Sequence, residues 1–145
     1  MKNTLRAGLT YTHRFTVTDA KTVPNLYPES VAFRAMPRVF ATGYMVGLLE
    51  WTCIELLRPH LDDGEGSLGV AIDVSHIAAT PPGMEVTVEA RVDKVDGKRV
   101  DFSVVARDAL DEIGRGRHGR AIVRWDRFNA KVAEKAAKAA MAATG

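Results

Sequence analysis

The fold is decided by Val39-Phe-Ala-Thr-Gly-Tyr-Met-Val-Gly-Leu-Leu-Glu-Trp-Thr-Cys-Ile54, a stretch apolar enough to form the most buried helix of the chain. Thr42 stands at a plausible N-cap, so we expect the helix from about Gly43 through Leu57, where Pro59 closes it. Gly43 and Gly47 share one helical face, and each costs helix stability unless something packs closely against that face. A sheet wrapped tightly around the helix would supply that packing.

Glu50 is the only charged side chain between Arg38 and Glu55. An unpaired carboxylate removed from water is costly, so such a group is normally paired, protonated or placed where its basicity is used. Glu50 is therefore the first candidate for chemistry. The alternative is that it lies on an exposed stripe of an amphipathic helix.

Composition limits the possible functions. The 145 residues are 46% hydrophobic and 26% charged, which fits one soluble domain. A net charge of +2 does not give the basic footprint of a nucleic-acid binder, and no run approaches the roughly 18 apolar residues of a membrane span. The N-terminus has no apolar signal-peptide region, so we expect a cytoplasmic protein. Cys53, the single cysteine, is expected in the core. The four histidines form no close-spaced pair, so we predict no metal site.

Strand-like patterns lie on both sides of the helix. One alternates over residues 11–17, and four follow at Leu68 to Ile77, Met84 to Asp93, Arg99 to Asp108, and about Ile113 to Asp126. Short turns join the last four, which favours antiparallel neighbours. Three prolines make residues 23–38 a lid or connecting segment. Residues 129–145 form an Ala/Lys-rich tail, either a surface helix or a fraying end.

This element order predicts an α+β domain over residues 1–128, namely a hotdog fold in which an antiparallel sheet wraps around a long central helix. Four motifs are more specific: Phe40-Ala-Thr-Gly-Tyr-Met-Val-Gly-Leu-Leu-Glu-Trp51, Gly64-Glu-Gly-Ser-Leu-Gly69, Val74-Ser-His-Ile-Ala-Ala-Thr-Pro-Pro-Gly83 and Asp111-Glu-Ile-Gly114. In order and spacing they resemble the fluoroacetyl-CoA thioesterase family from about Lys21 to Lys131. The resemblance implies a hotdog homodimer that hydrolyses acyl-CoA thioesters, with coenzyme A as part of the substrate and no separate cofactor.

The resemblance also implies site residues. The family's catalytic threonine, glutamate and histidine fall on Thr42, Glu50 and His76, and its substrate-contacting glycine and arginine fall on Gly69 and Arg120. Strand periodicity agrees for His76, which would share an inward face with Val70, Ile72 and Val74. The alternative is a hydrogen-bonded core histidine.

These residue types suit acyl transfer, which needs an activated nucleophile and a stabilised oxyanion. Glu50 is expected either to deprotonate water or to attack the carbonyl itself. His76 is suited to moving a proton near neutral pH, and Thr42 either positions the others or only caps the helix. Gly69 lets a backbone N–H approach the thioester oxygen, with a strand bulge as the alternative reason for glycine. The family's interfacial sites suggest Glu50 and His76 from different protomers.

Four arginines, Arg115, Arg117, Arg120 and Arg124, crowd the last strand. Guanidiniums in such a cluster bind the phosphates of coenzyme A or protect an edge strand, and only Arg120 is put forward as a site residue. The family's aromatic lid residue is replaced by Met36, although Phe33 remains nearby. We therefore expect short or substituted acyl-CoA substrates without fluorine selectivity. The alternatives are a non-catalytic hotdog module that binds acyl-CoA or a related carboxylate, and a purely structural dimer.

Overall fold

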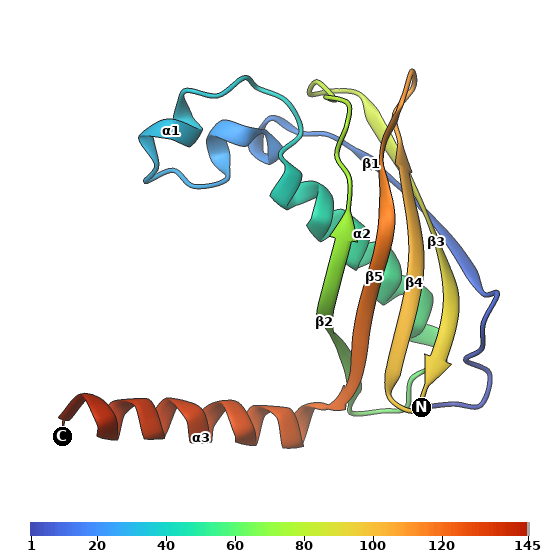
Figure 1. Ribbon diagram of the computed structural model, residues 1–145, viewed down its shortest axis with the longest axis vertical. Helices are drawn as coiled ribbons and strands as arrows, with labels where there is room; N and C mark the ends of the chain where they lie inside the picture. Colours follow the sequence, from blue (N-terminus) through green and yellow to red (C-terminus); the bar gives the residue numbers. More distant parts are fainter. Residues whose placement is uncertain (145) are drawn as a thin grey trace.

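The computed structural model describes residues 1–144. A five-stranded antiparallel sheet curves around one long helix, with the strand order β1-β3-β4-β5-β2 (Figure 1). The strands are β1 Thr10–Thr16, β2 Glu65–Val74, β3 Glu85–Asp96, β4 Arg99–Arg107 and β5 Glu112–Arg124. The helices are α1 Val31–Arg34, α2 Thr42–Leu57 and α3 Trp125–Thr144, and short 3-10 turns cover Asp19–Lys21, Val23–Asn25 and Arg58–His60. The expected hotdog arrangement is confirmed.

The core lies between α2 and the inner face of the sheet. Burial alternates along the central strands, as expected when every second side chain points inward. These inward positions are Val86, Val88, Ala90 and Val92 on β3 and Val100, Phe102, Val104 and Ala106 on β4. Helix α2 adds Met45, Leu49 and Cys53, so the expected place of Cys53 in the core is confirmed. Burial raises the pKa of the Cys53 thiol to about 12.

Two details of the expected helix were wrong. Ala41 is the N-cap and Thr42 is already helical, which frees the Thr42 hydroxyl for another partner. The glycine face does not pack against the sheet: a Cβ on Gly43 would meet Leu26, and a Cβ on Gly47 would have no atom within 4 Å. The reason is that the large apolar residues of α2, such as Met45 and Leu49, take the sheet-facing side.

The end of β2 also differs from the expectation. The strand stops at Val74, although backbone N–H groups of Ser75 and Ile77 still donate to the carbonyls of Arg115 and Ile113. His76 therefore lies just beyond the strand rather than on its inward face. Strand β2 forms one edge of the sheet, because among residues 1–144 it pairs only with β5.

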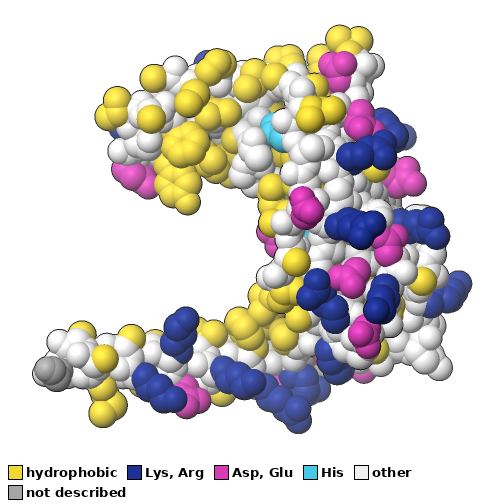
Figure 2. Space-filling model, in the orientation of Figure 1, with side chains coloured by type: hydrophobic (Ala, Val, Ile, Leu, Met, Phe, Trp, Pro, Cys, Tyr) yellow, Lys and Arg dark blue, Asp and Glu magenta, His cyan; other side chains and the backbone are white. Residues whose placement is uncertain are grey.

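The tail is a helix, and it begins at Trp125 instead of residue 129. None of its described residues is buried, and it projects away from the sheet (Figure 1). The expected tail also included Gly145, which lies outside the described residues. Together with residues 23–38, which we call the lid segment, α3 gives the molecule a C-shaped outline, with hydrophobic side chains along the inner rim (Figure 2). No helix within residues 1–144 has the length and apolarity to cross a membrane.

Candidate active site

Thr42 and His76 form the first part of the site. Thr42 opens α2, His76 follows β2, and a hydrogen bond of 2.7 Å joins Thr42 Oγ1 to His76 Nδ1. The other ring nitrogen, Nε2, is buried and has no hydrogen-bond partner within residues 1–144. Burial lowers the pKa of His76. The pair thus presents a neutral imidazole with one unsatisfied nitrogen.

Glu50 forms the second part, further along the same helix. Thr42, Val46 and Glu50 are spaced by four residues and share one face of α2. Eight residues of helix separate Thr42 from Glu50 by about 12 Å along the axis. The Glu50 carboxylate accepts a hydrogen bond of 3.0 Å at Oε2 from Nη1 of Arg120, and this is its only hydrogen bond among the described residues. Glu50 is paired but partly open, so neither full burial nor a free surface position describes it.

Arg120 is the buried member of this ion pair. Its exposed fraction is 2%, and Ser67 and His118 accept hydrogen bonds from it as well. Nε donates to Ser67 Oγ at 2.8 Å, Nη2 donates to the Ser67 carbonyl at 2.9 Å, and Nη1 lies 3.1 Å from His118 Nε2. A buried guanidinium is tolerated only with such partners, because leaving it unpaired is costly. The guanidinium is therefore held in one orientation.

Gly69 supplies the space in which the Glu50 carboxylate lies. A Cβ at this position would come within 2.8 Å of Glu50 Oε2 and 3.2 Å of His118 Cε1. The register of β2 also shifts between Gly69 and Ala71, so the strand bulge that was the alternative reason for glycine is present as well. Glycine is thus required here by close approach of side chains.

A cavity of about 270 Å³ opens beside these residues. Its lining combines one face of α2 with the bulged part of β2: Val46, Glu50, Gly69, Val70, Ala71, Ile72 and His118. The walls are mostly apolar, and the Glu50 carboxylate is the charged group among them. Such a cavity can take a small acyl group next to a carboxylate.

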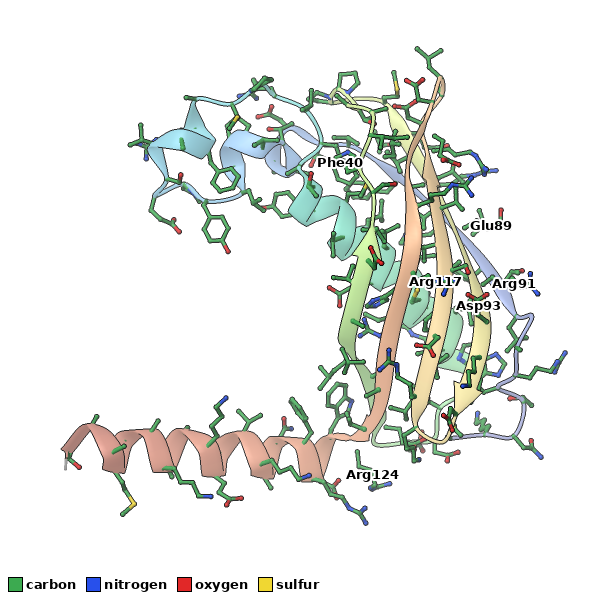
Figure 3. All side chains as sticks on the ribbon, viewed as in Figure 1. Phe40, Glu89, Arg91, Asp93, Arg117 and Arg124 are labelled. Carbon is green, nitrogen blue, oxygen red and sulfur yellow. The ribbon has the colours of Figure 1, made fainter. Side chains whose placement is uncertain are left out.

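His118 is the member of the cluster that sequence reasoning did not select. It is 3% exposed, and its Nδ1 lies 2.7 Å from the Ala71 carbonyl. One signal was available, since residues 118 and 120 of a strand share a face and Arg120 was already a candidate. The remaining arginines of β5 differ: Arg115 pairs with Glu112, and Arg124 pairs with Asp126 at the junction of β5 and α3 (Figure 3). No hydrogen bond within residues 1–144 joins Arg117 to Glu50 or His118.

The lid segment carries Phe33 and Met36. The side chain of Ser30 caps α1, and Phe33 stacks on Tyr27 with ring centroids 5.6 Å apart. Met36 is 49% exposed. Neither Phe33 nor Met36 lines the Glu50 cavity in the single chain. Helix α1, which belongs to the same segment, lies beyond the edge strand β2 (Figure 1). Within one chain the site therefore has three separate parts: the Thr42–His76 pair, the Glu50 cluster and the lid segment.

This chain is similar to known proteins in both sequence and structure. Residues 17–126 match the family model of fluoroacetyl-CoA-specific thioesterases. A fluoroacetyl-CoA thioesterase from Streptantibioticus cattleyicolor is 53% identical over 135 residues, covering 93% of this chain and 97% of that protein. A solved structure of a fluoroacetyl-CoA thioesterase superposes with a TM-score of 0.89 at 53% identity, covering 90% of this chain and 97% of the other. A hot-dog-like protein from Thermanaerovibrio acidaminovorans superposes with a TM-score of 0.77 at 27% identity, covering 90% of this chain and 93% of the other.

Proposed function

The chain belongs to the family of fluoroacetyl-CoA-specific thioesterases and is a thioester hydrolase, and on that premise we propose that it hydrolyses short or substituted acyl-CoAs to the free acid and coenzyme A. The observation that carries this proposal is the Glu50 carboxylate, which Arg120 holds by one oxygen at the wall of a small, mostly apolar cavity. A carboxylate fixed in this way is suited to act on a thioester carbonyl.

Two routes are consistent with this arrangement. In one, Glu50 takes a proton from water, and the hydroxide attacks the carbonyl carbon. In the other, the carboxylate attacks, and water then cleaves the resulting anhydride. In both, the C–S bond breaks and coenzyme A leaves as a thiolate. A proton is transferred to the thiolate sulfur as it leaves or afterwards. His76 is suited to move that proton because burial keeps its imidazole neutral. The Thr42 hydroxyl orients the ring through Nδ1.

The backbone N–H of Gly69 is proposed to receive the developing oxyanion, since glycine leaves its approach unobstructed. The first turn of α2 adds unpaired N–H groups and partial positive charge beside Thr42. Arg120 is proposed to act on the substrate through Glu50. Its buried guanidinium is used by Ser67, Glu50 and His118, which does not favour a contact with the phosphates of coenzyme A.

A homodimer with the active site at its interface is the assembly that we propose. Strand β2 has a free edge, and its Val70 and Ile72 are 52% and 46% exposed beside the Glu50 cavity. Pairing of two β2 edges in antiparallel fashion would cover these side chains. It would also bring the Thr42–His76 pair of one protomer toward Glu50 of its partner. The buried, unpartnered Nε2 of His76 supports this, because a buried polar atom normally has a partner.

The same assembly gives the lid segment a role. Because α1 lies beyond β2 (Figure 1), we propose that the lid segment covers a cavity that the partner helps to form. Met36 is flexible and apolar, so we propose that this lid excludes water while admitting more varied acyl groups than an aromatic lid would. The cytoplasmic location expected from the sequence stays a prediction.

The test is thiol release from a panel of acyl-CoAs, namely acetyl, fluoroacetyl, branched, aromatic and longer-chain thioesters, with the wild type beside Glu50→Gln. We expect release from some members, and loss of release without loss of binding in Glu50→Gln, which keeps the shape of the side chain and removes its basicity. Binding without release across the panel would favour the non-catalytic module, an alternative that membership of a hydrolase family does not support. Loss of stability in the variant without any ligand binding would favour a structural dimer.

A further inference from the structure

We propose that His118 is a positioning residue for Glu50 and acts through Arg120; this inference rests on the proposed hydrolysis. His118 comes from β5, lines the Glu50 cavity and lies behind the guanidinium of Arg120. The three side chains form a chain of contacts in which Arg120 Nη1 reaches Glu50 Oε2 at 3.0 Å and His118 Nε2 at 3.1 Å.

The contacts fix the tautomer of His118. Its Nδ1 faces the Ala71 carbonyl at 2.7 Å, and a carbonyl oxygen only accepts, so Nδ1 carries the proton. Nε2 then holds a lone pair, which accepts from Nη1 of Arg120. A second proton on Nε2 would remove that acceptor and place two cations in contact. His118 also stacks on Phe102 with ring centroids 6.4 Å apart, which fixes the plane of the ring.

This arrangement controls how Arg120 meets Glu50. A guanidinium and a carboxylate commonly pair through two parallel hydrogen bonds, which would occupy both oxygens of Glu50. Here Ser67 takes Nε and one hydrogen of Nη2, and His118 takes one hydrogen of Nη1. Of the two hydrogens that remain, one on Nη1 and one on Nη2, only the Nη1 hydrogen contacts Glu50, at Oε2. The other carboxylate oxygen, Oε1, has no hydrogen-bond partner within residues 1–144. The function of His118 is to keep that second oxygen available for the reaction.

Three substitutions distinguish the contribution of the Nδ1–H donor from that of the Nε2 acceptor. His118→Phe keeps the ring and its stacking but removes both hydrogen bonds. His118→Asn places an amide donor where Nδ1–H stands and leaves Arg120 without its acceptor. His118→Gln extends an amide oxygen to the position of Nε2 and restores that acceptor. We expect the Phe and Asn variants to lose kcat on the order of 10-fold to 100-fold with little change in KM, and the Gln variant to recover a large part of the rate.

His13→Phe is the matched control. His13 is another histidine of the sheet, half-buried and packed edge-on against Trp51 at 4.3 Å, but it lies outside the cluster. The same ring exchange there should leave kcat unchanged. A wild-type kcat in folded His118→Phe, or equal rates in the Asn and Gln variants, would overturn the positioning role.

A double variant tests whether His118 acts through Glu50. In the Glu50→Gln background, the further change His118→Phe should not lower the residual rate, because the carboxylate that it positions is gone. Multiplication of the two separate losses would instead show an independent role and overturn the inference.

A second readout does not depend on turnover. Nitrogen-15 NMR of the ring should show His118 as the neutral Nδ1–H tautomer at pH 7 in the folded chain. If the wild type hydrolyses no acyl-CoA, the proposed function fails, while this tautomer would still support the hydrogen bond from Arg120 to His118 Nε2. If hydrolysis is present and the tautomer is Nε2–H, the proposed function stands and the positioning of Arg120 by His118 is overturned.

Discussion

Thr42 Oγ1 lies 2.7 Å from His76 Nδ1 across 34 residues of sequence. No hydrogen bond within residues 1–144 joins this pair to Glu50, which lies about 12 Å further along α2. Chemistry that uses all three residues therefore needs a second chain or a large movement. The rigid packing of α2 against the sheet favours a second chain.

Subunit complementation distinguishes the two cases. Glu50→Gln and His76→Gln are each expected to be inactive alone. If each site takes Glu50 from one protomer and His76 from its partner, a mixed dimer of the two variants contains one intact site. Random exchange makes half of the dimers mixed, so we expect activity to return to about a quarter of the wild-type value per chain. The measurement is thiol release before and after exchange.

The control mixes Glu50→Gln with a Glu50→Gln/His76→Gln double variant. No dimer in that mixture has a wild-type Glu50, so no activity should return. Absence of recovery in the first mixture, with exchange proven by mass, would place both residues of a site in the same chain.

A methyl group at residue 69 should damage the site without unfolding the protein. The Cβ of Gly69→Ala would lie 2.8 Å from Glu50 Oε2, so the carboxylate has to move. We expect kcat to fall on the order of 100-fold. Gly47→Ala is the matched control, because its Cβ would have no atom within 4 Å and its helical position favours alanine. That variant should gain about 0.5–1 kcal/mol in free energy of unfolding and keep its activity.

The sequence predicted the fold well because its patterns are local. Alternation along residues 85–107 and an apolar helix around Glu50 are repeated signals, and the short turns left antiparallel pairing as the expected arrangement. Helix and strand ends were less accurate, as with Thr42, because one residue of difference changes the local pattern little.

The contacts of the site were harder to predict. From the sequence, a single arginine on a strand is interpreted as a surface charge or a phosphate ligand. The folded chain shows instead that Arg120 is buried and bonded to Ser67 and Glu50. His118 was weighed in the sequence only as a metal ligand. Its role depends on the β2–β5 register, which places it near the Ala71 carbonyl and which no short motif encodes.

Cys53 should be unreactive in the native protein. It is fully buried, and its pKa of about 12 leaves almost no thiolate at pH 8. We expect a disulfide reagent to label this single thiol only after denaturation, so labelling also reports unfolding. Native labelling at the rate of the denatured chain would show that α2 opens readily.

Stability should fall as the pH is lowered from 7.5 to 5.5. Burial lowers the pKa of both His76 and His118 in the folded state, whereas the unfolded value is about 6.5. The unfolded chain then binds more protons in this window, so the free energy of unfolding decreases as pH falls through 6.5. The lowered pKa of Glu65, about 2, matters only below about 4.5.

The comparison for this pH dependence is His118→Phe. The charged groups that act on the imidazole are Arg120 on β5, Glu50 on α2 and Arg99 on β4. A second pocket that His118 lines also carries Asp73, Asp93, Lys94, Asp101 and Arg117. Thermal unfolding of the variant should show a shallower dependence on pH than that of the wild type. Equal slopes would mean that His118 titrates alike in both states.

Met36→Phe should narrow the range of acyl groups that the enzyme hydrolyses. Met36 lies half exposed in the lid segment, and methionine has more rotatable bonds than phenylalanine, so it adapts to groups of different shape. A rigid ring should favour one small group and exclude branched and longer ones. The measurement is kcat/KM for each acyl-CoA of the panel. Val31→Phe places the same ring at a more exposed lid position and should leave the profile unchanged; an unchanged profile in Met36→Phe would show that the lid does not set selectivity.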